Sequence, residues 1–195
     1  MSSPKLQQAF AKFDAYNAKD PNQEISEEKT YPKEVLYAER MTKKLNDYAS
    51  DSPEYMQLAV RCQHIGRWEI ARNVYPMDRP GYLTWRSQLK LHHTKVAGPI
   101  LQECGYDEET ISKVKALLLK KNLQQNTDTQ LIEDVICLVF VEYYLDDFSR
   151  QHSEEKMLDI VRKTLKKISP QGIEAALKIH MTEHVKSLIM KATAS

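Results

Sequence analysis

The sequence contains little of what several common protein classes require. Only 5 of its 195 residues are glycine, and they form neither a glycine-rich phosphate loop nor a dinucleotide-binding fingerprint. No apolar run approaches the roughly 20 residues that a transmembrane helix needs, and the first residues lack the apolar core of a signal peptide. We therefore expect no membrane association and a cytoplasmic location, with the nucleus left open.

The sequence also has few cysteines and a net charge close to zero. Cys62, Cys104 and Cys137 are odd in number and far apart, which suits a reducing compartment and gives no zinc-finger spacing. The 28 basic and 27 acidic residues leave a formal net charge of +1. This balance argues against nucleic-acid binding driven by bulk charge, although it is compatible with a local basic pocket.

The hydrophobic periodicity is helical along the whole chain, and no alternating strand pattern is present. Proline and capping residues predict helices at about 4–18, 32–48, 53–72, 80–105, 107–121, 127–148, 153–167 and 170–193. The helix over 80–105 would have a kink or break at Gly98–Pro99. We predict an all-α, single-domain bundle of about eight helices, with no sheet beyond a stray hairpin. Residues 1–30, including a polar loop at 19–29, would form an arm, and residues 31–195 would form the domain.

Residues 61–86 are the most informative stretch, since they hold both tryptophans and five arginines. On a helix that continues to residue 72, five of the side chains would form one stripe: Gln57, Arg61, His64, Trp68 and Arg72. Arginine forks and a flat apolar wall suit a phosphate or carboxylate. The stretch predicts an anion pocket in which Arg61, Arg67, Arg72, Arg79 and Arg86 clamp phosphate. Trp68, Tyr82 or Trp85 would stack on a ring of the ligand.

Three polar residues interrupt faces that otherwise point to a core. They are His64, His92 (in line with Trp85 and Leu89), and Asp134, which follows Glu133 at the start of an apolar run. A buried carboxylate needs a cation, a hydrogen-bond donor or a metal, and two imidazoles with one carboxylate make a reasonable metal shell. The alternative is structural: histidines bonded to backbone, and Asp134 capping its helix or pairing with an arginine.

The order of these residues resembles a known but uncharacterised family. Arg61-Cys-Gln-His64, Arg67-Trp-Glu-Ile70, Gly81-Tyr82 and Trp85-Arg86 are similar to the signature of helical proteins of bacteria, plants and fungi catalogued as a domain of unknown function. Residues 105–107 and 133–140 extend the resemblance, which covers about residues 35–180. This family implies no activity.

A fainter resemblance, to HD-type metal-dependent phosphohydrolases, implies chemistry. Their Arg-spacer-His pattern resembles residues 61–64, their His-Asp pair falls on His92-His93, and their later acidic block is similar to residues 130–138. His93 and Ile136 replace two aspartates of that pattern. The resemblance implies an HD-like core and a divalent metal held by His64, His92 and Asp134, with His93 or Glu133 as catalytic base or further ligand. Such a shell favours manganese, nickel, cobalt or zinc, or the metal has been lost.

We therefore expect hydrolysis of a phosphorylated small molecule, with a nucleotide as one candidate. One alternative is a non-catalytic anion-binding or nucleotide-binding protein with a degenerate HD site. Another is a structural or interaction protein whose arginines form buried ion pairs with Glu69, Asp78 and Glu133. The oligomeric state stays open.

Two further motifs have an ordinary interpretation. His180-Met-Thr-Glu183-His184 matches a short zinc-protease string, in which both histidines would share a helix face, but a solvated face explains it as well. Lys120 and Lys121 suit a helix C-terminus or, in the HD interpretation, the wall of the pocket.

Overall fold

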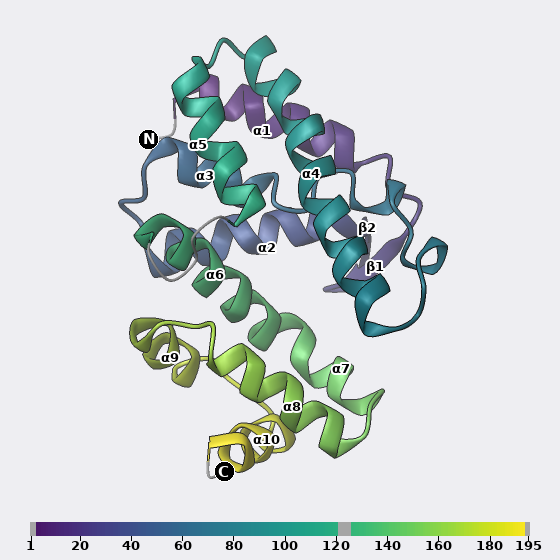
Figure 1. Ribbon diagram of the computed structural model, residues 1–195. Helices are drawn as coiled ribbons and strands as arrows, with labels where there is room; N and C mark the ends of the chain where they lie inside the picture. Colours follow the sequence, from purple (N-terminus) through teal and green to yellow (C-terminus); the bar gives the residue numbers. More distant parts are fainter. Residues whose placement is uncertain (1–2, 121–125, 194–195) are drawn as a thin grey trace. The chain divides into compact units, whose positions relative to one another are not determined.

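The computed structural model describes residues 3–120 and 126–193. Contacts divide the chain into two compact units, residues 1–121 and 122–195, and each is described by itself (Figure 1). Ten α-helices and one two-stranded sheet provide most of the regular structure of the described residues. The prediction of a mostly helical protein with at most a stray hairpin is confirmed. Within these residues, no helix has the length and apolar character needed to cross a membrane.

The described part of the first unit, residues 3–120, contains five α-helices. They are α1 (Pro4–Asn17), α2 (Lys33–Tyr48), α3 (Glu54–Arg61), α4 (Arg79–Glu103) and α5 (Glu108–Leu119). The side chains of Ser3, Asp78 and Asp107 accept backbone N–H groups at the starts of α1, α4 and α5. These groups would otherwise lack a partner at a helix N-terminus, so each cap fixes where its helix begins.

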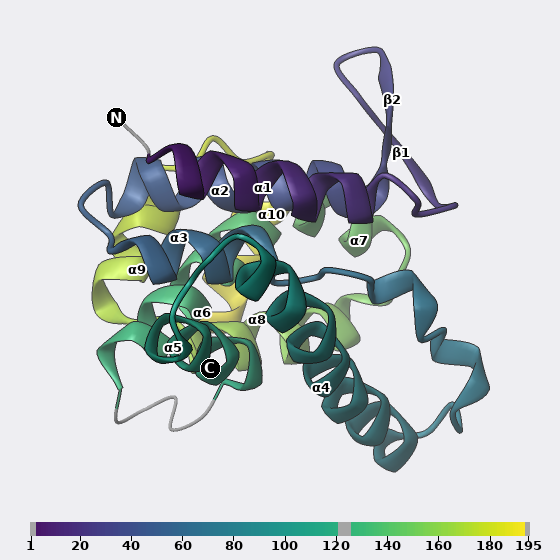
Figure 2. The ribbon, with the colours of Figure 1, turned by 90° about the horizontal axis from the view of Figure 1, so that it is seen from above.

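Part of the segment expected as a polar loop is a β-hairpin. Strand β1 (Gln23–Ser26) pairs antiparallel with β2 (Lys29–Pro32), and Figure 2 shows the hairpin projecting beyond α1 and α2. Arg40 of α2 binds Glu24 and donates to the hydroxyl of Ser26 at 3.4 Å. This contact between segments holds the hairpin, which explains why a loop prediction from local composition was wrong here.

Helix α3 lies in the core of the first unit. Leu58, Ala59 and Val60 are fully buried, and α3 packs against α1, α2 and α5. Burying side chains of the size of leucine or valine contributes about 1.5–3 kcal/mol each. Packing on several sides holds the end of α3 firmly, and this end begins the turn that carries His64.

The predicted helix to residue 72 was wrong, because α3 ends at Arg61. The chain then turns, and Gly66 adopts the left-handed backbone conformation, with φ +66°. A Cβ atom on Gly66 would lie 2.8 Å from Nε2 of His92, so both the backbone and the space require glycine. The expected single stripe from Gln57 to Arg72 does not form.

Of the predicted kink or break at Gly98–Pro99, the break was wrong, since α4 continues to Glu103 with Pro99 inside it. A Cβ atom on Gly98 would lie 2.8 Å from Cε of Lys115 in α5. This close approach of α4 and α5 supports the helix through Pro99, whose ring removes one backbone hydrogen bond.

The second unit contains α6 (Thr127–Val139), a π-helical turn (Phe140–Tyr144), α7 (Leu145–Arg150), α8 (Glu154–Leu165), α9 (Pro170–Leu177) and α10 (Glu183–Thr193). Its core includes Leu145, Met157, Val161, Val185 and Leu188. The expected single helix over 170–193 was wrong, because the chain breaks between α9 and α10. The hydroxyl of Thr182 accepts the backbone N–H of Val185 at 3.3 Å and so marks the new start.

This break bears on the zinc-protease string. His180 precedes α10, whereas His184 lies within it. The two imidazoles therefore do not share a face of one helix, and the geometry that the string needs does not form. The ordinary interpretation of this string is retained.

Candidate functional site

A basic recess lies in the first unit, where three segments meet. Helix α4 presents four side chains at helical offsets 0, 3, 4 and 7, which place them on one face. The turn after α3 adds three more, and the residue that caps the C-terminus of α5 adds one. The recess has a volume of about 230 Å³, including the space open to solvent. It is lined by Gln63, His64, Arg67, Arg86, Leu89, Lys90, His93 and Lys120.

The lining carries four cations and no carboxylate. Arg67, Arg86, Lys90 and Lys120 are all half-buried, so water screens their charges less than at an open surface. Sequence reasoning identified His64, Arg67, Arg86 and His93, and it placed Lys120 either here or at a helix end. It missed Gln63 and Lys90, although the spacing of Lys90 from Arg86 on α4 was a usable signal. Lys121 lies outside the described residues.

His93 forms a neutral wall of the recess. Its Nδ1 lies 2.7 Å from the carbonyl oxygen of Ile65, and a carbonyl can only accept, so Nδ1 carries the proton. Burial, together with the neighbouring His64, holds the pKa of His93 well below its usual value. At neutral pH the other ring nitrogen, Nε2, therefore has a lone pair that can accept a hydrogen bond.

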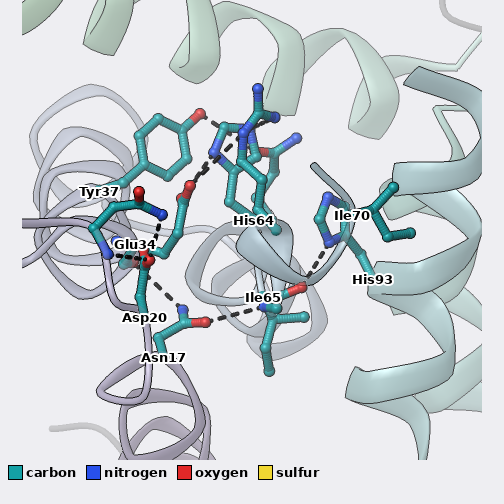
Figure 3. Close-up of polar contacts among 12 residues, drawn as sticks. Asn17, Asp20, Glu34, Tyr37, His64, Ile65, Ile70 and His93 are labelled. Carbon is teal, nitrogen blue, oxygen red and sulfur yellow. Dashed lines mark hydrogen bonds and ion pairs between the residues drawn. The ribbon is translucent and has the colours of Figure 1, made fainter. Parts of the chain in front are cut away.

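His64 lies between a carboxylate and a guanidinium. Its Nδ1 is 3.1 Å from Oε2 of Glu34 (Figure 3). Its Nε2 is 3.3 Å from Nη1 of Arg67. A guanidinium can only donate, so Nε2 accepts from Arg67 and Nδ1 donates to Glu34. Arg67 also places Nε 3.7 Å from Oε1 of Glu34. The three side chains thus form one chain of polar contacts.

Burial sets the protonation of this chain. Glu34 is 5% exposed, and desolvation raises its pKa to about 7 despite the opposing charges of Arg67 and Lys33. Burial, then the charges of Arg67 and Arg86, hold the pKa of His64 well below its usual range. Its ring also stacks on Tyr37, with centroids 4.0 Å apart. The neutral form of His64 is therefore favoured at pH 7, and Glu34 titrates near neutrality.

Residues of α1 and the following turn hold Glu34 in place. Asp20 accepts the backbone N–H of Glu34 at 3.2 Å. The Asn17 amide donates to the carbonyl of Glu34 at 3.4 Å and accepts the N–H of Gly66 at 3.2 Å. Asn17 is 1% exposed. It therefore joins the start of α2 to the turn that carries His64.

His92 belongs to a different group of contacts. Its Nε2 lies 3.1 Å from Oε2 of Glu69 but makes no aligned hydrogen bond. Glu69 also accepts the phenolic O–H of Tyr16 at 2.7 Å, and burial followed by this bond raises the pKa of Tyr16 to about 12. His92 is therefore a neighbour of His93 that does not line the recess.

Three of the five predicted clamp arginines lie elsewhere. Arg61 is 9% exposed and binds Asp14 through Nε at 2.9 Å and Nη2 at 2.6 Å. Arg72 donates to the backbone carbonyls of Tyr75 and Asp78, and Arg79 is exposed. The buried ion pair at Arg61 supports the structural alternative for this residue, with Asp14 as a partner that the sequence did not indicate.

The three aromatic residues expected to stack on a ligand do not line the recess. Trp85 is 8% exposed and donates its indole N–H to the carbonyl of Ile70 at 2.9 Å. The guanidinium carbon of Arg67 lies 4.9 Å from the centre of the Trp85 ring. This cation–π contact helps to hold Arg67 in position. Trp68 packs near Tyr16, and Tyr82 is 45% exposed.

Glu133 and Asp134 are buried in α6 of the second unit. Asp134 accepts Nε2 of Gln130 at 2.9 Å, the backbone N–H of Ser169 at 2.8 Å and the hydroxyl of Ser169. The same hydroxyl accepts the N–H of Gly172. Asp134 therefore stabilises the N-terminus of α9.

As they lie, the predicted ligands do not fit a metal ion. Across residues 3–120 and 126–193, no three His, Cys, Asp or Glu side chains come together in a set able to hold one. Nε2 of His64 faces a guanidinium, and both oxygens of Asp134 already accept hydrogen bonds. A positive metal beside Arg67 would be repelled. The metal remains a prediction from resemblance.

Comparison with known proteins identifies one family. A family model described as a domain of unknown function (DUF4202) matches residues 7–189. No curated protein and no solved structure gives a significant match. The match extends over both units, so the helical signature of the sequence and the basic recess lie within the family domain.

Proposed function

We propose that this chain, which belongs to the family described as a domain of unknown function (DUF4202), binds a phosphorylated small molecule in the basic recess. The observation that carries the proposal is the lining of four cations with no carboxylate. Clustered, partly desolvated cations attract an anion far more strongly than isolated surface charges do.

The kinds of donor favour phosphate. Arginine offers two parallel N–H groups that match phosphate oxygens, and lysine adds a mobile point charge. Lone pairs on neutral imidazoles such as His93 can accept a hydroxyl of the ligand or a protonated phosphate oxygen. The recess is small and partly open to solvent, so we expect it to hold the anionic group and leave the rest of the ligand outside.

Hydrolysis of the bound phosphate ester is the second candidate. It rests on the HD resemblance and on His93, a neutral base in the wall of the recess. An HD-like core and a divalent metal from manganese, nickel, cobalt and zinc remain parts of this proposal. The contacts of the described side chains support the binding function more strongly, because the predicted ligands are engaged with other partners.

Calorimetric titration with inorganic phosphate, glucose 6-phosphate and AMP tests the binding function. We expect Arg86→Ala and Lys90→Ala each to weaken binding about tenfold, which corresponds to about 1.4 kcal/mol. Lys95→Ala is the matched control, since Lys95 is an exposed lysine of the same helix. Equal losses in Lys90→Ala and Lys95→Ala would show a general charge effect. No binding by the native protein would favour the structural alternative.

A separate experiment tests hydrolysis. Elemental analysis before any chelator is added measures the metal content, and phosphate release is then assayed with each metal. A hydrolase should lose turnover in His93→Ala while it still binds phosphate. Metal-free protein that binds phosphate without turnover would support the non-catalytic alternative.

A further inference from the structure

A second cavity lies within the second unit and shares no residue with the basic recess. Its volume is about 490 Å³, including the space open to solvent. The lining residues come from the π-helical turn, from α7, α8, α9 and α10, and from the connections on either side of α9. None of the predicted site residues lines this cavity, and the proposed anion-binding function does not use it.

The lining of this cavity is apolar. Eleven of the twelve lining residues have apolar side chains. The remaining one, Thr164, donates its hydroxyl to the backbone carbonyl of Ile160 at 2.9 Å. Water inside the cavity would therefore find few hydrogen-bond partners, although a stable buried water needs two to four of them. An apolar group that replaces such water gains free energy because its surface is buried. The lining thus suits a hydrocarbon group.

The π-helical turn supplies one wall of the cavity. Phe140 and Val141 begin this turn and line the cavity, and both are half-buried. Turns of this kind are rare and are frequently found at functional sites. The turn is therefore an indication of a binding site that does not depend on the apolar lining.

Leu177 marks the mouth of the cavity, since it lines the cavity and is nevertheless 70% exposed. The next residue, Lys178, is exposed as well. Two more exposed lysines, Lys166 and Lys167, directly follow the lining residue Leu165. Cationic side chains therefore accompany the apolar residues of this part of the lining.

The sequence around these lysines is basic. Residues 162–181 contain five lysines and arginines but one carboxylate, that of Glu174, whereas the whole chain has a formal net charge of +1. Lysine stems can lie along apolar surface while their charged ends attract an anion. The mouth therefore suits a ligand that has an apolar body and an anionic end.

We propose that this cavity binds the hydrocarbon tail of a medium-chain aliphatic carboxylate, whose carboxylate lies at the mouth beside Lys178. The tail would enter past Leu177 and extend towards the wall formed by Phe140 and Val141. A narrow, flexible chain suits a cavity that is partly open to solvent. No covalent bond changes on binding, and this inference is independent of the anion-binding function of the basic recess.

Calorimetric titration of the full chain with sodium butyrate, hexanoate, octanoate and decanoate tests this inference. Each methylene that enters the cavity should raise the affinity about threefold to fourfold, until the cavity is filled. 1-Octanol has a comparable chain without the charge, so it should bind about two- to fivefold more weakly than octanoate. Absence of binding, or an affinity that does not rise with chain length, would overturn the inference.

Ala176→Leu locates the bound chain. Ala176 lines the cavity, so a leucine there should occupy its space and weaken octanoate binding at least tenfold, with a native or higher melting temperature. Ala175→Leu changes the neighbouring alanine of α9, which does not line the cavity, and should bind octanoate as the native protein does. Native affinity in folded Ala176→Leu would overturn the location.

Lys178→Gln tests the anionic end, and it keeps the inference falsifiable if Ala176→Leu does not fold. We expect it to lower octanoate affinity about two- to fivefold and to leave 1-octanol affinity unchanged. Lys156→Gln, an exposed lysine in the first turn of α8, is the matched control. Equal losses in the two variants would show a general charge effect and overturn the role of Lys178.

Three further measurements exclude other occupants of the cavity. Inorganic phosphate at constant ionic strength should not displace octanoate, and competition would place the carboxylate in the basic recess instead. Sedimentation with phosphatidylglycerol vesicles tests for a membrane, and size-exclusion chromatography tests for a second copy of the chain. Vesicle binding without octanoate binding, or a dimer that Ala176→Leu converts to a monomer, would overturn the inference.

Discussion

Oε2 of Glu34 lies 3.1 Å from Nδ1 of His64, and the carboxylate is 5% exposed. Helix α2 supplies the acid and the turn after α3 supplies the imidazole. Burial shifts the two pKa values in opposite directions. It raises the pKa of Glu34 to about 7 and holds the pKa of His64 well below its usual value. Both groups therefore favour their neutral forms in the folded protein.

Glu34→Gln should change how stability depends on pH. The folded protein holds the Glu34 proton more tightly than the unfolded chain, so this contribution is complete below pH 4.5 and is lost as the pH rises through about 7. The whole difference corresponds to about 3 kcal/mol. His64 and His93 act oppositely, since their contribution is complete above 6.5 and is lost as the pH falls.

Urea unfolding at pH 5 and pH 8 measures this effect. Both histidines are present in the native protein and the variant, so their contribution cancels in the comparison. The stability of Glu34→Gln relative to the native protein should rise by about 2–3 kcal/mol between these two pH values. A constant difference would mean that Glu34 titrates near its ordinary pKa in the folded protein.

Lys120→Gly should distinguish a role of Lys120 in anion binding from a role in the stability of α5. Lys120 ends α5 in the left-handed conformation, with φ +53°, where glycine is the preferred residue. The variant should match or exceed the native melting temperature, with a gain of up to about 1 kcal/mol, while phosphate binding weakens. Loss of stability with unchanged binding would place the role of Lys120 in the helix end alone.

Gly66→Ala should be more destabilising than Gly105→Ala. Both glycines have positive φ, but a Cβ atom on Gly105 meets nothing within 4 Å, whereas one on Gly66 meets His92 at 2.8 Å. Each variant should lose about 1–2 kcal/mol for the backbone, and Gly66→Ala about 1–3 kcal/mol more for crowding. Thermal melts compare them. Equal losses would mean that the turn adjusts easily.

Asp134→Ala should weaken the second unit without changing phosphate affinity. The buried carboxylate accepts hydrogen bonds from Gln130 and Ser169, and charge-assisted bonds of this kind contribute about 1.5–3 kcal/mol. We expect a lower melting temperature, with native affinity measured at a temperature where the variant is folded. Loss of bound metal or of phosphate binding in the folded variant would instead support the predicted role as a ligand.

Arg61→Ala should lower stability, and no anion should restore it. The guanidinium forms a two-point contact with Asp14, which is partly exposed, so we expect a loss of about 2–3 kcal/mol. Arg79→Ala, at an exposed position, is the control and should unfold like the native protein. If phosphate rescued Arg61→Ala more than the control, Arg61 would act in the site after all.

Local signals predicted most helix starts correctly. Ser3, Asp78, Asp107 and Ser169 are short polar residues that each precede a helix, and each accepts a backbone N–H there. Helix ends were less predictable. Gly66 is a recognised stop signal, yet the spacing of polar and aromatic residues continued past it. This error placed His64 on a helix face rather than in a turn.

The acid of the candidate site could not be found from local pattern. Glu34 occupies the first turn of α2, where an acidic residue ordinarily faces solvent and favours the helix dipole. Its burial depends on Asn17, Asp20 and His64, which come from other segments. Arg67 and Arg86 were found because arginine near tryptophan is unusual, but only tertiary contacts separated them from Arg61 and Arg72.

The side-chain amide of Asn17 means that α1 helps to position the candidate site. It contacts both the backbone of Glu34 and that of Gly66, in addition to the side-chain contacts of Glu34 with His64 and Arg67. A chain shortened by its first 30 residues would therefore also lose the hydrogen bonds that Asn17 makes with Glu34 and Gly66. The acid and the imidazole would be free to move apart, and such a protein could stay helical while it loses the contact between Glu34 and His64.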